Sequence, residues 1–183
     1  MTGPVELVPG EFVLFVSQGG TEEQDSRFLD LLKEAWQKVP LPARTVILEH
    51  HHRVYHYYPK VILGARINNK YPIAMAGPEG CLLWCDLLRI LDLPGKDAWA
   101  VAVLGEELAH AFLTASQHPT HVSDPPNDSP ASPEYLAWDK AREDAMRDVL
   151  YQWPFDRAEH EKTLEWVMKT KGGLNPQQGH PTM

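Results

Sequence analysis

The sequence predicts one α+β domain in which a small antiparallel or mixed sheet packs on a single central helix. Three observations lead to this prediction. The chain has 183 residues with an ordinary hydrophobic fraction of 43%, short β-branched and aromatic stretches fill its first half, and a long apolar helix follows at Asp97. A chain of this length buries a core without disulfide or metal staples. We place the domain at residues 1–171 and expect residues 172–183 to form a flexible tail.

The first two elements are predicted to be a strand and a helix. Glu11 to Ser17 is a short stretch of β-branched and aromatic residues that ends before a Gly-Gly pair, which is typical of a strand. Thr21 and the acidic residues after it are typical of a helix N-terminus. Apolar residues then repeat at helical spacing until Pro40, so we expect a helix between Thr21 and Pro40.

A small β-meander is expected next. Arg44 to Tyr58 and Val61 to Asn68 are rich in residues that favour strands, and Asn68-Asn69 predicts a turn into a third stretch, Tyr71 to Ala76. The apolar run from Cys81 to Leu91 is predicted to be an amphipathic helix. Its two cysteines have no partners that would complete a zinc site, so we interpret them as core residues.

The second half of the chain is predicted to be helical. From Asp97 the run AWAVAVLGEELAHAFLTAS is apolar on almost every side, which places this helix at the centre of the fold. His118 to Pro133 is rich in Pro, Ser and Asp and predicts a mobile loop. A helix from Glu134 to Gln152 follows, and Asp156 is placed to cap a last helix that ends near Lys171.

The net charge and the N-terminal segment indicate which classes of partner and which cellular compartment to expect. A formal net charge of -8 and a pI near 5.5 argue against nucleic acid or an anionic membrane as the main partner, because both attract clustered Lys and Arg. The chain begins without the basic start and long apolar run of a signal peptide, and no window reaches a membrane-spanning length. We therefore expect a cytoplasmic protein that has neither nucleic acid nor a membrane as its main partner.

Three polar residues interrupt the apolar central helix and form the candidate site. Glu106 and His110 lie four residues apart and therefore on one face of a helix, where both can bind one metal ion. Glu107 lies beside them, where a metal hydrolase needs a general base for its attacking water. Burying these groups among Ala, Val, Leu and Phe costs several kcal/mol unless each is paired or bound to metal.

A third metal ligand is expected from the next long helix. Glu143 lies between Leu136 and Leu150 at heptad spacing, on the side that the apolar residues indicate, and two antiparallel helices would bring it to His110. Asp144 and Asp148 are the neighbouring alternatives, because a change of one residue turns the inward face by about 100°.

These residues carry a family resemblance. AVLGEELAHAF resembles the metal-binding helix of gluzincin metallopeptidases, and KAREDAMRDVL is similar to their downstream glutamate helix. The order of elements from about Val46 to Trp153, with VILGARI as a candidate edge strand, is similar to a minimal zincin-like domain. The resemblance implies a zinc-dependent peptidase whose substrate or partner is a peptide or protein. It also implies Glu106, His110 and Glu143 as metal ligands and Glu107 as general base.

The first ligand position departs from the family, which normally has His there. Glu106 brings a negative charge and a harder oxygen donor, so manganese or iron(II) would also suit the site. Three outcomes stay open: a working hydrolase with an altered metal, a metal-binding protein with little activity, or a zincin-like interaction or regulatory module without catalysis. In the last case Arg66 or Arg142 would neutralise the carboxylates in a structural network.

Other histidines are weaker candidates. His50, His52 and His56, with His51 among them, would share one face if Glu49 to Tyr58 were a strand, but they are also typical of a half-exposed strand. One of them, or Tyr57, could reach the metal site. His118 and His121 follow the metal helix, where we expect them to be loop residues.

Overall fold

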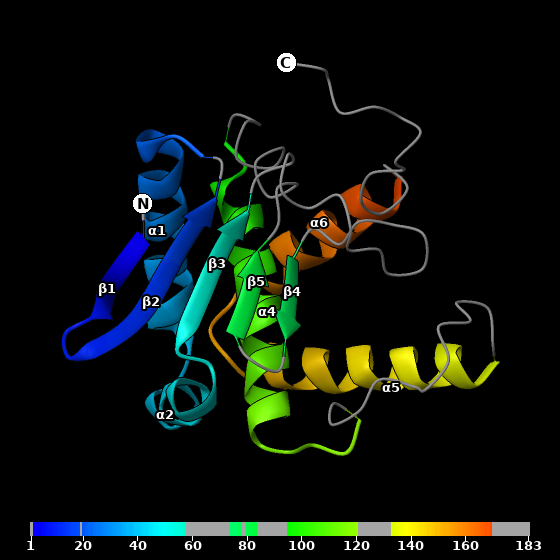
Figure 1. The fold of residues 1–183 in the computed structure, drawn as a ribbon. Coiled ribbons are helices and arrows are strands. Elements are labelled where there is room, and N and C mark those ends of the chain that lie inside the picture. The colour runs from blue at the N-terminus through cyan, green and yellow to red at the C-terminus, as the bar shows by residue number, and fades with distance from the viewer. Residues whose placement is uncertain are drawn as a thin grey trace.

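The strands of the computed structural model form one mixed sheet in the order β1-β2-β3-β5-β4 (Figure 1). The structure describes residues 2–18, 20–57, 74–77, 80–83, 95–120 and 133–169. Strands β1 (Thr2–Val8) and β2 (Glu11–Gln18) pair antiparallel. Gly10 in the turn between them has φ +85°, a conformation that glycine adopts without strain. The predicted strand at Glu11 to Ser17 is confirmed, whereas β1 was not predicted.

The predicted meander is wrong in its strand directions. β3 (Arg53–Tyr57) runs parallel to β2 and to β5 (Gly80–Leu83), and only β4 (Ala74–Gly77) pairs antiparallel with β5. Parallel neighbours need a long crossover connection, and two helices supply it between β2 and β3. The fold is therefore α+β with a mixed sheet.

Helix α1 (Glu22–Lys38) confirms the predicted first helix. Thr21 caps it in a reciprocal capping box, because the Thr21 side chain accepts from the Gln24 amide and the Gln24 side chain accepts from the Thr21 amide. Phe28, Leu32 and Trp36 recur at helical spacing and are buried. The helix therefore covers the sheet with its apolar side.

Helix α2 (Leu41–His50) replaces the first half of the strand that was predicted from Arg44 to Tyr58. The prediction is wrong here because Val46 and Ile47 favour strands by composition, whereas Pro42 in the first turn and the buried pair Ala43 and Ile47 follow a helical repeat. The helix packs on the central helix, and this tertiary contact outweighs intrinsic propensity.

The helix predicted from Cys81 to Leu91 is wrong at its start. Cys81 lies in strand β5, which pairs on both sides, with β3 and with β4. A short apolar run fits a buried strand as well as a helix, so periodicity could not separate them. Cys85, the stretch Val61 to Asn68 and the predicted tail lie outside the described residues.

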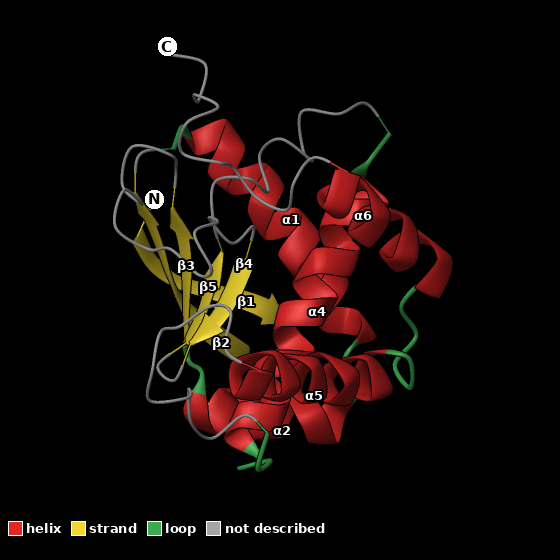
Figure 2. Cartoon of the chain, turned by 90° about the vertical axis from the view of Figure 1, so that its right-hand side faces the viewer, coloured by secondary structure: helices red, strands yellow, loops and turns green. Residues whose placement is uncertain are grey.

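Helix α4 (Asp97–Ala115) is the centre of the molecule, as predicted. It contacts α1, α2, β4 and β5 as well as the two later helices. Almost every one of its side chains from Trp99 to Ala111 is buried, which explains why its sequence is apolar all round. The described helices lie on one side of the sheet (Figure 2).

Two further helices complete the fold. Helix α5 (Pro133–Leu150) crosses the end of α4 and extends away from the body, with Met146 and Leu150 buried but Leu136 exposed (Figure 1). Helix α6 (Arg157–Lys169) begins after Asp156, whose carboxylate accepts from the Glu159 amide as predicted. Among the described residues, no helix has the length and hydropathy needed to cross a membrane.

Candidate metal centre

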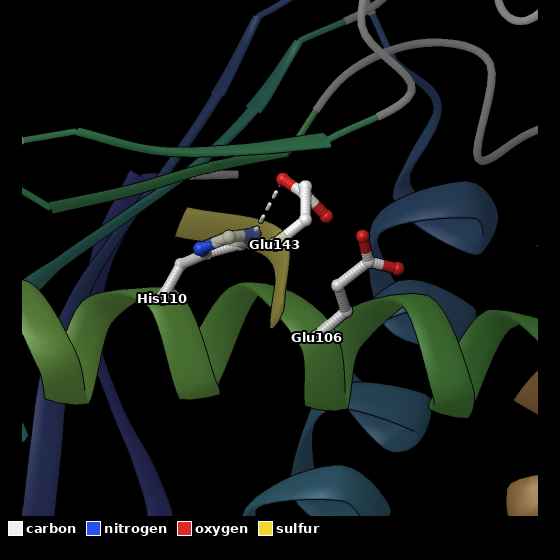
Figure 3. Close-up of side chains that lie close together, drawn as sticks. All are labelled: Glu106, His110 and Glu143. Atoms are coloured by element: carbon white, nitrogen blue, oxygen red, sulfur yellow. Dashed lines mark ion pairs between the residues drawn. The ribbon is translucent and has the colours of Figure 1, made fainter. Parts of the chain in front are cut away.

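Helix α4 presents Glu106 and His110 on consecutive turns of the same face (Figure 3). The residues between and beside them are buried in the core, so the helix is fixed in rotation and these two side chains are held on the same side. Glu106 is 17% exposed and His110 9% exposed. The pair therefore lies at the boundary between the core and solvent.

Helix α5 brings Glu143 to the same point. One ligand atom from each of Glu106, His110 and Glu143 lies within 4.8 Å of the other two. His110 Nε2 is 3.4 Å from Glu143 Oε1. Two ligands about 2.1 Å from one ion at the tetrahedral angle are separated by about 3.4 Å, so this pair already has the spacing of metal ligands. The group could hold a metal ion.

A neighbouring cation balances part of the charge. Arg142 Nη2 lies 3.1 Å from Glu143 Oε1, so Arg142 does neutralise this carboxylate, while Arg66 lies outside the described residues. Burial alone would raise the pKa of Glu143, but His110, Arg142 and Arg147 more than offset that effect, and its pKa lies below the usual value. Glu143 is therefore held in the ionised form that a metal ligand requires.

Glu107 is buried on α4 beside the first ligand. It directly follows Glu106 and lies three residues before His110. This spacing is the reason why Glu107 was predicted to be a general base. Its role as a base stays a prediction.

Two residues that sequence reasoning missed complete the surroundings of Glu106. His160 of α6 is fully buried, and its Nε2 lies 3.1 Å from Glu106 Oε2. Its Nδ1 lies 2.9 Å from the hydroxyl of Tyr151, which precedes α6. No sequence pattern pointed to His160, because it lies 54 residues from Glu106 in a mostly polar helix.

The alternative ligands that the structure describes are not part of this group. Asp144 pairs with Lys140 and Arg147 on the outer side of α5, and Asp148 is exposed. His118 Nδ1 is 2.6 Å from the Thr120 hydroxyl, just after the end of α4. His121 and the Tyr57 side chain lie outside the described parts.

The histidine-rich stretch does not form one strand face, so that expectation is wrong. His50 ends helix α2, His51 is its buried C-cap, His52 is exposed, and His56 lies in β3. His56 is instead a core residue, 3.4 Å from the carboxylate of Asp25. Helix α2 ends at His50 and strand β3 begins at Arg53, so the histidines that composition alone had placed on one strand face lie in different elements.

The donor set of the candidate centre is two carboxylates and one imidazole. This combination suits a divalent ion of intermediate hardness and fits zinc, manganese and iron(II). Comparisons of the chain with protein-family models, with curated proteins and with solved structures found no match.

Proposed function

We propose that this protein is a metal-dependent hydrolase of gluzincin type that cleaves peptide or related amide bonds. The observation that carries the proposal is the convergence of Glu106, His110 and Glu143, from two helices, with ligand atoms within 4.8 Å of one another. By the family resemblance the ion is zinc, and the extra carboxylate makes manganese or iron(II) alternatives. The zincin-like arrangement of the elements belongs to the same proposal.

The residues divide the work as follows. Glu106, His110 and Glu143 hold the ion, which when bound would polarise the substrate carbonyl and lower the pKa of an attacking water. Glu107 accepts the proton of that water and returns it to the leaving amine. Arg142 offsets part of the negative charge of Glu143, which stays available as a ligand. Glu106 and Glu143 are partly exposed to solvent, and we expect the substrate to reach the ion at these two side chains.

The test is metal binding by protein purified without a histidine tag. We expect about one zinc or manganese ion per chain and a melting temperature that rises with metal and falls with chelator. Glu143→Ala should weaken binding on the order of 100-fold, because it removes a direct ligand. Asp144→Ala is the matched control, since Asp144 is the next residue on α5 and pairs outward with Lys140. No metal uptake by the wild-type protein would refute the proposal.

A non-catalytic interaction module is the second candidate. The observation that favours it is that both carboxylates of the candidate ligand group already have protein partners. Glu106 contacts His160, and Glu143 contacts Arg142. Such pairs can satisfy buried charge without an ion. In that case chelator would leave the melting temperature unchanged, and Glu106→Ala would change stability but not metal content.

A further inference from the structure

The side chain of His160 joins Glu106 to a third residue, Tyr151. It is 0% exposed, and its two ring nitrogens face different oxygens, Glu106 Oε2 at 3.1 Å and the Tyr151 hydroxyl at 2.9 Å. A continuous chain of hydrogen bonds therefore runs from Glu106 of α4 through His160 of α6 to Tyr151, which precedes α6.

The direction of these hydrogen bonds follows from the chemistry of the groups. A carboxylate only accepts, so the proton of the first contact lies on His160 Nε2. In the neutral ring Nδ1 is then an acceptor, and the Tyr151 hydroxyl donates to it. Tyr151 thereby selects the tautomer of His160 that can donate to Glu106.

Tyr151 is itself held in place. The Arg157 guanidinium lies over its ring at 4.6 Å, and the rings of Tyr151 and His160 meet edge to face with centroids 5.6 Å apart. The start of α6 is fixed by the Asp156 cap and by a hydrogen bond from Trp99 of α4 to Glu159. The chain of hydrogen bonds therefore ends on a rigid part of the fold.

A glutamate ligand needs this support more than a histidine does. Its side chain has more rotatable bonds than an imidazole, and either oxygen or both can bind an ion. The hydrogen bond from His160 engages Oε2, so Oε1 is the Glu106 oxygen to which His160 does not donate. His160 does not belong to the described group of metal ligands, which is Glu106, His110 and Glu143.

We propose that His160, oriented by Tyr151, is a positioning residue that presents Glu106 to the metal through Oε1 alone. The proposal rests on the proposed metal site. It assigns to α6 a function at a centre whose ligands come from α4 and α5. It also explains how Glu106 can serve at the first ligand position, where the family that the sequence resembles normally has histidine.

The experiment measures metal affinity in three variants. Mn(II) is titrated into metal-free protein and followed by electron paramagnetic resonance, and Zn(II) is measured by competition with a chromophoric chelator. His160→Leu should weaken binding about 10- to 100-fold, as loss of a partner of a metal ligand does. His160→Gln should recover most of the affinity because its amide still donates, and Tyr151→Phe should give a smaller loss.

The matched control is His56→Gln. His56 of β3 is also a fully buried histidine that contacts a carboxylate, but that carboxylate is Asp25 of α1. We expect this variant to bind metal with wild-type affinity even if it is less stable. A loss of affinity in His56→Gln equal to that in His160→Leu would show that instability alone causes the effect and would overturn the proposal.

The outcomes separate this proposal from the proposed function. If wild-type protein binds no metal, both fail. If it binds metal and His160→Leu binds equally well, only the positioning role fails. Should His160→Leu not fold, Tyr151→Phe decides together with nitrogen-15 NMR of the metal-free wild-type protein. We expect His160 to carry its proton on Nε2, and a proton on Nδ1 alone would overturn the proposal.

Discussion

Two regions of this molecule place a histidine nitrogen 3.4 Å from a carboxylate oxygen. At the sheet, His56 Nδ1 of β3 faces Asp25 Oδ1 of α1, and between the helices α4 and α5, His110 Nε2 faces Glu143 Oε1. The sheet pair is 0% exposed on both sides, whereas Glu143 is 23% exposed. The same distance therefore occurs once inside the core and once at its boundary, and distance alone does not identify a binding site.

The charge around each pair differs more than its geometry. At the sheet, the ring of His56 stacks on Phe28 at 4.0 Å, and burial lowers the pKa of His56 to about 4 although Asp25 opposes this shift. At the helices, three carboxylates, those of Glu106, Glu107 and Glu143, occur with the imidazoles of His110 and His160 and with one guanidinium, that of Arg142. An excess of carboxylates at a partly exposed place attracts a cation, whereas the Asp25 carboxylate is fully buried and accepts a hydrogen bond from the Ser17 hydroxyl.

Replacing the proposed base should have the largest effect on this comparison. Glu107→Gln keeps the shape of the side chain but cannot take a proton, so hydrolysis of a quenched fluorescent peptide library should fall about 100- to 10,000-fold. Metal content and melting temperature should stay close to wild type. Asp25→Asn is the counterpart at the sheet and should lower stability without changing hydrolysis of the folded fraction. Equal losses of activity in both variants would contradict the distinction.

Acid should reveal the sheet pair through stability. His56 stays neutral in the folded chain down to about pH 4, whereas the unfolded chain takes up this proton below about pH 6.5. The unfolded state binds more protons between these values, so stability falls as the pH is lowered through this interval. The two pKa values correspond to a loss of up to roughly 3 kcal/mol. Urea unfolding at pH 7 and pH 4.5 measures it, and His56→Gln should show a flatter pH dependence.

Ser17 tests how the charge of Asp25 is maintained. Burial would raise the pKa of Asp25, but favourable contacts, among them the hydrogen bond from the Ser17 hydroxyl at 2.6 Å, lower it below the usual value. Ser17→Ala removes that donor from a charged acceptor and should cost about 2 kcal/mol in urea unfolding. Metal affinity should not change, and a change would mean that the two regions are coupled.

Gly105 provides the smallest and most local test on the helix side. A Cβ added there would lie 2.4 Å from Cε1 of the Phe155 ring, so Phe155 can approach α4 this closely only because residue 105 is glycine. Alanine normally favours a helix by about 1 kcal/mol, but the overlap should reverse the sign and destabilise the protein by about 1 kcal/mol. Thermal unfolding measures this change, and a stabilised Gly105→Ala would show that Phe155 moves aside without cost.

Much of the helical part of the fold could be predicted from the sequence, because long apolar repeats and capping residues are local signals. Helix α4 and the placement of Glu106 and His110 on one of its faces were predicted in this way. On α5, Leu150 marks the buried side as predicted and Glu143 rather than Asp144 joins the group, but Leu136, which was used in the same prediction, is exposed. The strand directions and helix α2 could not be predicted, because they depend on which element each short segment contacts. His160 is the clearest case, since its contact with Glu106 depends on the turn after α5 and on no repeat within α6.

The uneven anchoring of α5 has a consequence for hydrogen exchange. Its last two turns are secured by Met146 and Leu150, whereas Leu136 in its first two turns is 55% exposed. Local opening should therefore be easiest at the start of the helix and rarest near its end. Glu143 lies at the transition between these two parts. An ion bound there would slow amide exchange from Glu143 back toward Trp138, so protection along a single helix would report occupancy of the site.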